Sequence, residues 1–214
     1  GFELSISTRN IVTKDFTWST DFIYSHNKNE VTELQGGKKR VIDLVSGNGF
    51  AVEGYPVRSI FSIPFMGLNE EGLPTFRDQD GNISVSDVYF QERDHTDFLE
   101  YSGSADPTDI GSLGNTFSYK GFDLNFYFYG AFGYKKWRGQ VPDTGIIGNN
   151  GTAAGNTYKT IMTDVWNSQT GKGWMPGIAT NVYDSSNPSG RNDFNLMDGS
   201  YVKLKNITLG YKLT

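Results

Sequence analysis

The chain has 214 residues, including 26 glycines and no cysteine, with 14% aromatic residues and a formal net charge of −5. The lack of cysteine excludes disulfides, thiolate catalysis and cysteine-ligated zinc, and the acidic balance argues against nucleic acid as a partner. No window approaches the ~20 apolar residues of a membrane-spanning helix, although a barrel strand needs an apolar residue only at alternate positions.

The first predicted elements are two strands, over 1–12 and 16–31. In both segments apolar and polar residues alternate with a period of two, as in Phe2, Leu4 and Ile6. This is the pattern of strands whose two faces differ, because successive side chains point to opposite sides. The short polar stretch 13–15 between them predicts a hairpin with a tight connection.

A long loop region is predicted over residues 35–111. It is rich in glycine and proline and contains only short apolar runs. A second hairpin follows, in which Lys120-Gly121 supplies the turn within LGNTFSYKGFDLNFYFYGAF.

The strand after that turn separates two kinds of side chain. One face is predicted to carry Phe122, Leu124, Phe126 and Phe128. The other face carries Asp123, Asn125, Tyr127 and Tyr129. Two environments suit this pattern: a soluble antiparallel sheet with its apolar face inward, or a membrane barrel with its apolar face to lipid and its polar face to a wet lumen.

Another long loop region is predicted over 135–198, followed by a final strand over 201–213. The loop is polar and contains three of the four tryptophans. In the final strand, Val202 and Leu204 share one parity, whereas Ile207 and Leu209 have the other. This change of phase predicts a β-bulge near Lys205-Asn206.

The order of turns and loops favours the membrane barrel. Tight turns alternate with very long loops, whereas compact soluble domains join their elements with a median of ~4–6 residues. Outer-membrane barrels combine short periplasmic turns with long extracellular loops, and their strands need ~9–11 residues to cross the bilayer. Aromatic residues gather near the predicted strand ends, where an interfacial girdle would lie.

Three stretches of the chain resemble the C-terminal barrel region of SusC/RagA-type TonB-dependent outer-membrane transporters of Bacteroidetes-like bacteria. The first is GFELSISTRNIVTKDFTWSTDFIYSHNKNEVTEL. The second runs from GLNEEGLPTFRDQDGN to LGNTFSYKGFDLNFYFYGAFGY, and the third is DGSYVKLKNITLGYKL. They occur in the family's order and extend over nearly the whole chain.

The resemblance implies an all-β fold: an antiparallel segment, residues 1–214, of a transmembrane barrel of about 22 strands with long extracellular loops. It implies import of glycans or peptides across the bacterial outer membrane. No catalysis is expected, because the spacing of the two histidines and the acids shows no hydrolytic constellation, and no cofactor is required. The expected partners are the remainder of the barrel, a plug domain, TonB acting through that plug, outer-membrane lipid and a SusD-like surface lipoprotein. The plug and the final strands are expected to be absent from this segment, because no plug or TonB-contacting stretch is recognisable and the family chain normally continues past the TLGY strand. Five strands are clear and two more are candidates within 41–63, which is too few to close a barrel without open edges in lipid.

Residues 76–87 (FRDQDGNISVSD) bear a partial likeness to a calcium-binding loop. Asp78, Asp80, Asn82 and Ser84 alternate as oxygen ligands, and Gly81 permits a sharp turn. The glycine comes one place too early for an EF-hand, and the acidic residue at position twelve is missing. A plain turn between two strands and a weak Ca²⁺ site are the two interpretations.

The tryptophans of the second loop region are candidate ligand contacts. Trp137, Trp166 and Trp174 could stack on sugar rings or anchor peptides, or they could pack loop against loop. The alternative to a transporter is a soluble β-sandwich that binds carbohydrate through these loops, and a third reading is a structural module without a ligand. The lumen-facing residues 123, 125, 127 and 129 are expected to keep a wet wall and to contact the plug.

Overall fold

The computed structural model describes residues 1–70, 72–85, 88–137 and 191–213. Its main feature is one antiparallel sheet of five strands, each 11 residues long. These strands are β1 (Phe2–Val12), β2 (Phe16–His26), β8 (Asp109–Tyr119), β9 (Phe122–Phe132) and β12 (Tyr201–Tyr211). Eleven residues extend about 37 Å, which matches a tilted crossing of a bilayer.

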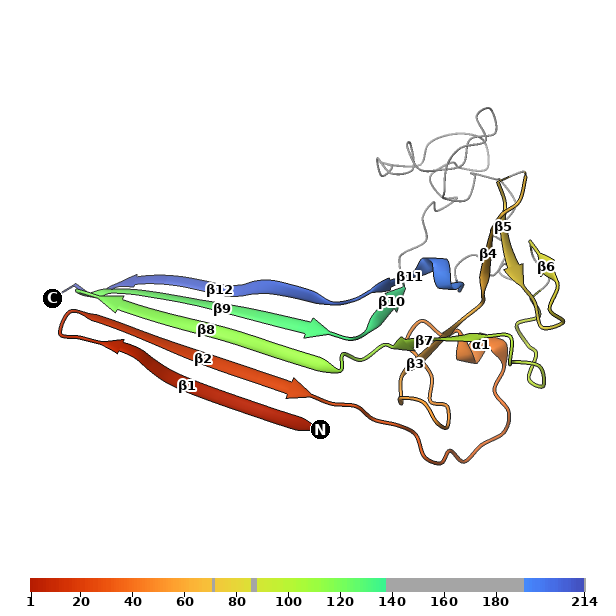
Figure 1. Ribbon diagram of the computed structural model, residues 1–214, viewed down its shortest axis with the longest axis horizontal. Coiled ribbons are helices and arrows are strands. Elements are labelled where there is room, and N and C mark those ends of the chain that lie inside the picture. Colours follow the sequence, from red (N-terminus) through yellow and green to blue (C-terminus); the bar gives the residue numbers. More distant parts are fainter. Residues whose placement is uncertain (71, 86–87, 138–190, 214) are drawn as a thin grey trace.

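The strands lie in the order β1-β2-β8-β9-β12, so every strand neighbours the next long strand in the sequence (Figure 1). The sheet is a single layer that does not close on itself, with β1 and β12 at its edges. The predicted all-β, antiparallel barrel segment is thereby confirmed. The described residues place no second sheet on either face, so they do not form the alternative two-layer sandwich.

Both predicted tight turns are present at the same end of the sheet (Figure 1). Thr13 begins a three-residue connection and donates its N–H to the carbonyl of Phe16 at 2.8 Å. The second turn has only two residues, Lys120 and Gly121, with φ of 44° and 89°. Positive φ at both positions is the geometry that joins two twisted antiparallel strands without splaying them.

Two β-bulges interrupt the outer strands. The predicted bulge in β12 is confirmed, because the pairing with β9 shifts between Leu204 and Asn206. A second bulge, which was not predicted, shifts the pairing of β1 with β2 between Arg9 and Ile11. Each bulge adds one residue to an edge strand, so the apolar side chains change parity and still remain on one face.

The other end of the sheet carries a folded unit, here called the cap, formed by the described residues of 27–108, 133–137 and 191–200 (Figure 1). Its elements are α1 (Val41–Leu44), β3 (Ser59–Ser62), β4 (Phe65–Leu68), β5 (Pro74–Arg77), β6 (Ile83–Ser84), β7 (Glu100–Ser104), β10 (Lys135–Trp137), the 3-10 helix η3 (Asp193–Asn195) and β11 (Leu196–Asp198). Three small antiparallel sheets result: β3 with β7, β4-β5-β6, and β10 with β11.

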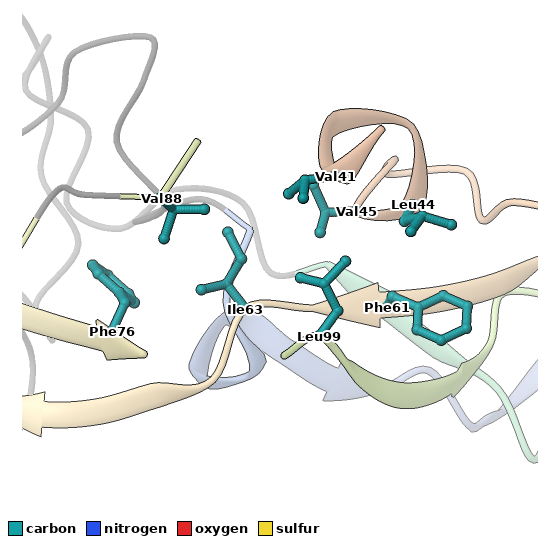
Figure 2. Packing of buried hydrophobic residues seen from close by; sticks show 8 residues of the cluster. All are labelled: Val41, Leu44, Val45, Phe61, Ile63, Phe76, Val88 and Leu99. Atoms are coloured by element: carbon teal, nitrogen blue, oxygen red, sulfur yellow. The ribbon is translucent and has the colours of Figure 1, made fainter. Parts of the chain in front are cut away.

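The cap has its own hydrophobic core, formed by residues of the glycine- and proline-rich region 35–111 that was predicted as a long loop. Figure 2 shows the aliphatic side chains of the α1 segment facing residues of the cap's strands and loops. The buried cluster comprises Val41, Leu44, Val45, Phe61, Ile63, Phe76, Val88 and Leu99. Each short element contributes only one or two of these residues, so no periodic pattern in the sequence predicts this core.

The segment after residue 190 is part of the same core. Ile63 donates its N–H to the carbonyl of Arg191 at 3.0 Å, and Asp193 donates back to Ile63 at 3.2 Å. The rings of Phe65 and Phe194 lie 4.9 Å apart. The strand β12 therefore enters the sheet from a position that the cap holds in place.

Among the described residues, no helix is both long enough and apolar enough to cross a membrane.

Candidate functional site: a strand wall with two unlike faces

One face of the five-stranded sheet, here called the apolar face, carries aromatic and aliphatic side chains in rows that cross the strands. The pairings align Ile6, Phe22, Leu113, Phe128 and Leu204 into one row through all five strands. Four of these five residues are 37–48% exposed. The row exists because every strand contributes an apolar residue at the same register.

The apolar face continues beyond this row and is not covered by any described element (Figure 1). Phe122 is 51% exposed, and Ile207 and Leu209 on the neighbouring strand are 63% and 73% exposed. Leu124, Phe126 and Phe128 lie on the same face and are half-buried by their neighbours. A contiguous apolar surface of this extent is not left in water by soluble monomers, so it requires an apolar medium or partner.

The opposite face, here called the polar face, bears Asp123, Asn125, Tyr127 and Tyr129. Neighbouring strands satisfy the first two: Ser118 donates to the Asp123 carboxylate, and the Asn125 amide donates to the Thr116 hydroxyl at 2.8 Å. The Tyr127 ring packs beside Gly114, where a Cβ would lie 3.4 Å from the ring. The polar face is therefore a hydrogen-bonded wall lined with tyrosine rings.

Two lysines of β12 join the tyrosines on this face, and the sequence reasoning did not single them out. The ammonium of Lys203 lies 5.8 Å from the ring centre of Tyr129 and 5.3 Å from that of Tyr201. The Lys205 ammonium lies 5.7 Å from the Tyr129 ring. The signal in the sequence was the Lys-x-Lys spacing on the polar parity directly before the change of phase.

A polar cluster also interrupts the apolar face across β1, β2 and β8. Asn10, the extra residue of the β1 bulge, donates to the Thr20 hydroxyl at 2.7 Å, and Thr20 donates to Asn115 at 2.8 Å. The Trp18 indole also donates to Asn115, at 2.9 Å, and Thr8 donates to Asn10 at 2.8 Å. Each member is hydrogen-bonded to another member, which lowers the cost of placing these polar groups on a face that meets an apolar medium.

A carboxylate marks the edge of the apolar face next to the cap. Asp109, the first residue of β8, accepts hydrogen bonds from the hydroxyls of Tyr24 and Thr108, the latter at 2.6 Å. The His26 ring nitrogen lies 2.9 Å from the same carboxylate. A tyrosine whose hydroxyl meets a charged group suits the boundary between hydrocarbon and water.

The cap contains a surface depression of about 460 Å³, whose rim includes Lys38, Lys39, Arg93 and Asp94. The Lys38 ammonium is 2.6 Å from the Asp94 carboxylate and holds the pKa of that carboxyl below its usual range. Beside the rim, the Glu92 carboxylate accepts backbone N–H groups of residues 94, 93 and 95, which lower the Glu92 pKa. These contacts hold the loop 92–97 in shape.

The predicted calcium loop forms the connection between β5 and β6. The carboxylate of Asp78 is buried and accepts the backbone N–H groups of Asp80 and Asn82 at 2.9 and 2.8 Å. Gly81 has a φ of 83° and completes the turn. Within the described ranges no group of three or more acidic or histidine side chains is positioned to hold a metal ion. The geometry accounts for a turn, and calcium at Asp78, Asp80, Asn82 and Ser84 stays a prediction.

Of the three tryptophans predicted to contact ligand, Trp137 is described, and Trp166 and Trp174 lie outside the described residues. Trp137 is half-buried at the end of β10, with the Arg191 guanidinium 6.0 Å from its ring centre. Its indole nitrogen is buried and has no hydrogen-bond partner among the described residues. Ligand contact by these residues stays a prediction.

The arrangement defines a class of protein. A single antiparallel layer of bilayer-length strands, with an exposed apolar face and a hydrogen-bonded polar face, is a segment of the wall of a large transmembrane β-barrel. Short turns at one end and a folded cap at the other end complete that architecture (Figure 1).

In comparisons with known proteins, the chain is similar to TonB-dependent receptors. The chain is 30% identical over 235 residues to TonB-dependent receptor P3 of Formosa agariphila, a match to 100% of this chain and 21% of that protein. It is 26% identical over 226 residues to TonB-dependent receptor SusC of Bacteroides thetaiotaomicron, covering 99% of this chain and 20% of that protein. The chain thus spans about a fifth of the length of these relatives. No protein-family model matches it.

Solved structures agree on the fold. A chain of the RagAB peptide transporter matches 98% of this chain and 22% of its own length, with 21% identity and a TM-score of 0.68. The RagAB peptide importer in its "closed-closed" state matches with 20% identity and a TM-score of 0.67. The resemblance to SusC/RagA-type TonB-dependent receptors, inferred from three stretches, is confirmed over the whole chain.

Proposed function

We propose that this chain is part of the barrel wall of a TonB-dependent transporter of the SusC/RagA type that imports glycans or peptides across the bacterial outer membrane. The observation that carries the proposal is the row of exposed apolar side chains through five bilayer-length strands, in a chain similar over its full length to TonB-dependent receptors. In a barrel transporter, one face of such a wall meets lipid and the other face meets the water-filled lumen.

In this proposal the apolar face meets lipid, and Phe122, Leu124, Phe126 and Phe128 are lipid-facing. Asp123, Asn125, Tyr127 and Tyr129 face the lumen, where they keep the wall wet and touch the plug. The cap lies on the cell surface, because outer-membrane barrels have short turns on the periplasmic side and long excursions outside.

One expected partner, the remainder of the barrel, follows from the open edges of the sheet. The unpaired backbone groups of β1 and β12 require further barrel strands, because lipid offers no hydrogen bonds. A plug that connects to TonB, and a SusD-like lipoprotein over the cap, complete the proposed assembly. The relatives are named as receptors, which supports a role without catalysis.

Alternating accessibility along β9 tests the assignment of the faces. This chain has no cysteine, so single cysteines at positions 122–129, in a complete receptor from which any cysteine outside the chain has been removed, report one side chain each. Fluorophores attached to even positions before the receptor is folded into lipid should be quenched by spin-labelled lipids. Cysteines at odd positions of the folded receptor should react with a membrane-impermeant maleimide, because thiolates form in water and not in hydrocarbon. Uniform reactivity along the strand would contradict the proposed faces.

Uptake by cells tests the activity. Cells that express the receptor should accumulate fluorescent oligosaccharides or oligopeptides in a TonB-dependent manner, and deletion of the receptor should abolish this accumulation. Uptake that persists after deletion, or that does not require TonB, would contradict the proposal.

A further inference from the structure

The feature that carries a further inference is the group of two lysines and two tyrosines on the polar face, here called the lysine–tyrosine patch (Tyr129, Tyr201, Lys203 and Lys205). The two rings lie 6.1 Å apart across β9 and β12. Three ammonium–ring distances of 5.3–5.8 Å join them to the lysines. The patch thus combines two positive charges with two flat apolar surfaces in one place.

The bulge in β12 falls at Lys205, and both lysines reach the Tyr129 ring. Lys203 pairs with Tyr129, and Leu204 pairs with Phe128 on the apolar face. Lys205 has no pairing partner, because the register resumes only at Asn206. Without the extra residue, the apolar side chains after Leu204 would change face.

The charges of the patch are not neutralised by the described residues. None of the five ion pairs found there involves either lysine, and both lysine side chains are exposed. Two acids of the polar face, Asp21 and Asp123, accept hydrogen bonds from Ser7 and Ser118 instead. An unpaired pair of cations on a water-lined wall attracts anions, most strongly where low-dielectric walls confine the field.

The patch lies at the end of the sheet that adjoins the cap, where a cargo would enter the lumen from the cap side. Tyr201 is the first residue of β12 and adjoins the cap, and Tyr129 lies in the half of β9 that approaches the cap (Figure 1). A molecule that enters the lumen from the cap side therefore meets the patch early.

We propose that the lysine–tyrosine patch binds acidic saccharides, with a carboxylate of the uronate type at the lysines and a sugar ring against the tyrosines. The lysine ammonium groups supply point charges with three donors each, and tyrosine rings offer apolar contact to the C–H face of a sugar. This inference rests on the proposed transport function and assigns it a substrate class.

The test measures binding to the complete, purified receptor by calorimetry. The probes are hexagalacturonate and its fully methyl-esterified form, which keeps the sugar rings and removes the charges. The unaltered receptor should prefer the acid, and that preference should decrease as salt rises. The double variant Lys203→Gln/Lys205→Gln should lose about 5- to 30-fold in affinity for the acid and change little towards the ester. Lys203→Arg/Lys205→Arg should retain the preference.

The matched control is Lys14→Gln/Lys212→Gln, which removes two charges at the turn end of the sheet and should leave affinity unchanged. Equal binding of acid and ester, no binding of hexagalacturonate, or no loss in the double glutamine variant would overturn the inference. Tighter binding of hexaglutamate than of hexagalacturonate would assign the patch to acidic peptides and overturn the saccharide.

A contact between the lysines and the plug is the competing explanation, and it has its own signature. The double glutamine variant would then raise the ion conductance of the receptor in planar bilayers without changing affinity for hexagalacturonate, which would also overturn the inference. The proposed transport function is tested separately, by the cysteine accessibility along β9 and by TonB-dependent uptake. Neither measurement depends on these lysines, so a negative result there contradicts the transport function and not the binding of acidic saccharides.

Discussion

Replacing Ile207 with arginine tests which medium the apolar face meets. Ile207 lies in the middle of β12, pairs with Phe126 and is 63% exposed. Since so much of the side chain is uncovered, arginine fits there without displacing a described neighbour. The stability of the variant therefore reports the surroundings of the wall rather than the packing within it.

The expected magnitude follows from that position. An arginine on the lipid face near the bilayer midplane costs about 2–4 kcal/mol, which is roughly a 30- to 700-fold change in the folding equilibrium. In water, a substitution at so exposed a site would stay within about 0.5 kcal/mol. Thr208→Arg is the matched control, because Thr208 is the next residue, is exposed, and lies on the polar face opposite Asn125.

The assay folds the complete receptor into phosphatidylcholine vesicles and follows the folded fraction against guanidinium, using heat-modifiable migration on gels. We expect Ile207→Arg to lower the midpoint and Thr208→Arg to leave it nearly unchanged. Equal midpoints for the two variants would refute the reasoning, because both side chains would then be in the same medium.

Three further predictions concern the polar cluster and the cap. Asn115→Ala leaves the donors of Trp18 and Thr20 without their acceptor and should cost about 1–3 kcal/mol in the same vesicle assay; an unchanged midpoint would show that water reaches the cluster. Gly49→Ala should destabilise the cap by about 1–3 kcal/mol, because Gly49 has a φ of 75° and a Cβ there would lie 2.5 Å from the Arg58 carbonyl oxygen. Limited proteolysis should detect this loss of stability. Gly37→Ala is the control that should have no effect, because a Cβ at Gly37 meets nothing within 4 Å. Hydrogen bonds from Arg40 lower the pKa of Asp43 below its usual 3.8. The stabilisation of α1 by these bonds is therefore present above about pH 4 and is lost as the pH falls through the folded-state pKa. Hydrogen exchange of residues 41–45, corrected for intrinsic rates, should show this loss in the unaltered chain and not in Asp43→Asn.

The two bulges explain how edge strands of this wall keep a single apolar face. In β1 the change of parity falls at Asn10, and in β12 it falls at Lys205. In both strands the extra residue takes a defined role: Asn10 enters the polar cluster, and Lys205 joins the lysine–tyrosine patch. The bulges therefore place polar groups as well as preserving the register of the apolar rows.

The sequence by itself determined the long strands, their faces and their tight turns. Alternation with a period of two is a local property, because neighbouring side chains of a strand point to opposite sides whatever lies around them. Lys120-Gly121 predicted a two-residue turn, and the change of phase after Leu204 predicted a bulge at the place where the register shifts. Three stretches of the sequence were enough to identify the resemblance to SusC/RagA-type receptors, which the comparisons confirm.

Only the tertiary structure decided the cap and the lysine–tyrosine patch. Val41, Ile63 and Phe76 meet in one core although no period relates them, and residues 191–194 join that core from far along the chain. Lys205 reaches the Tyr129 ring because β12 pairs with β9 across a bulge. Contacts of this kind depend on which segments the fold brings together, and a local pattern carries no information about a partner some 70 or 130 residues away.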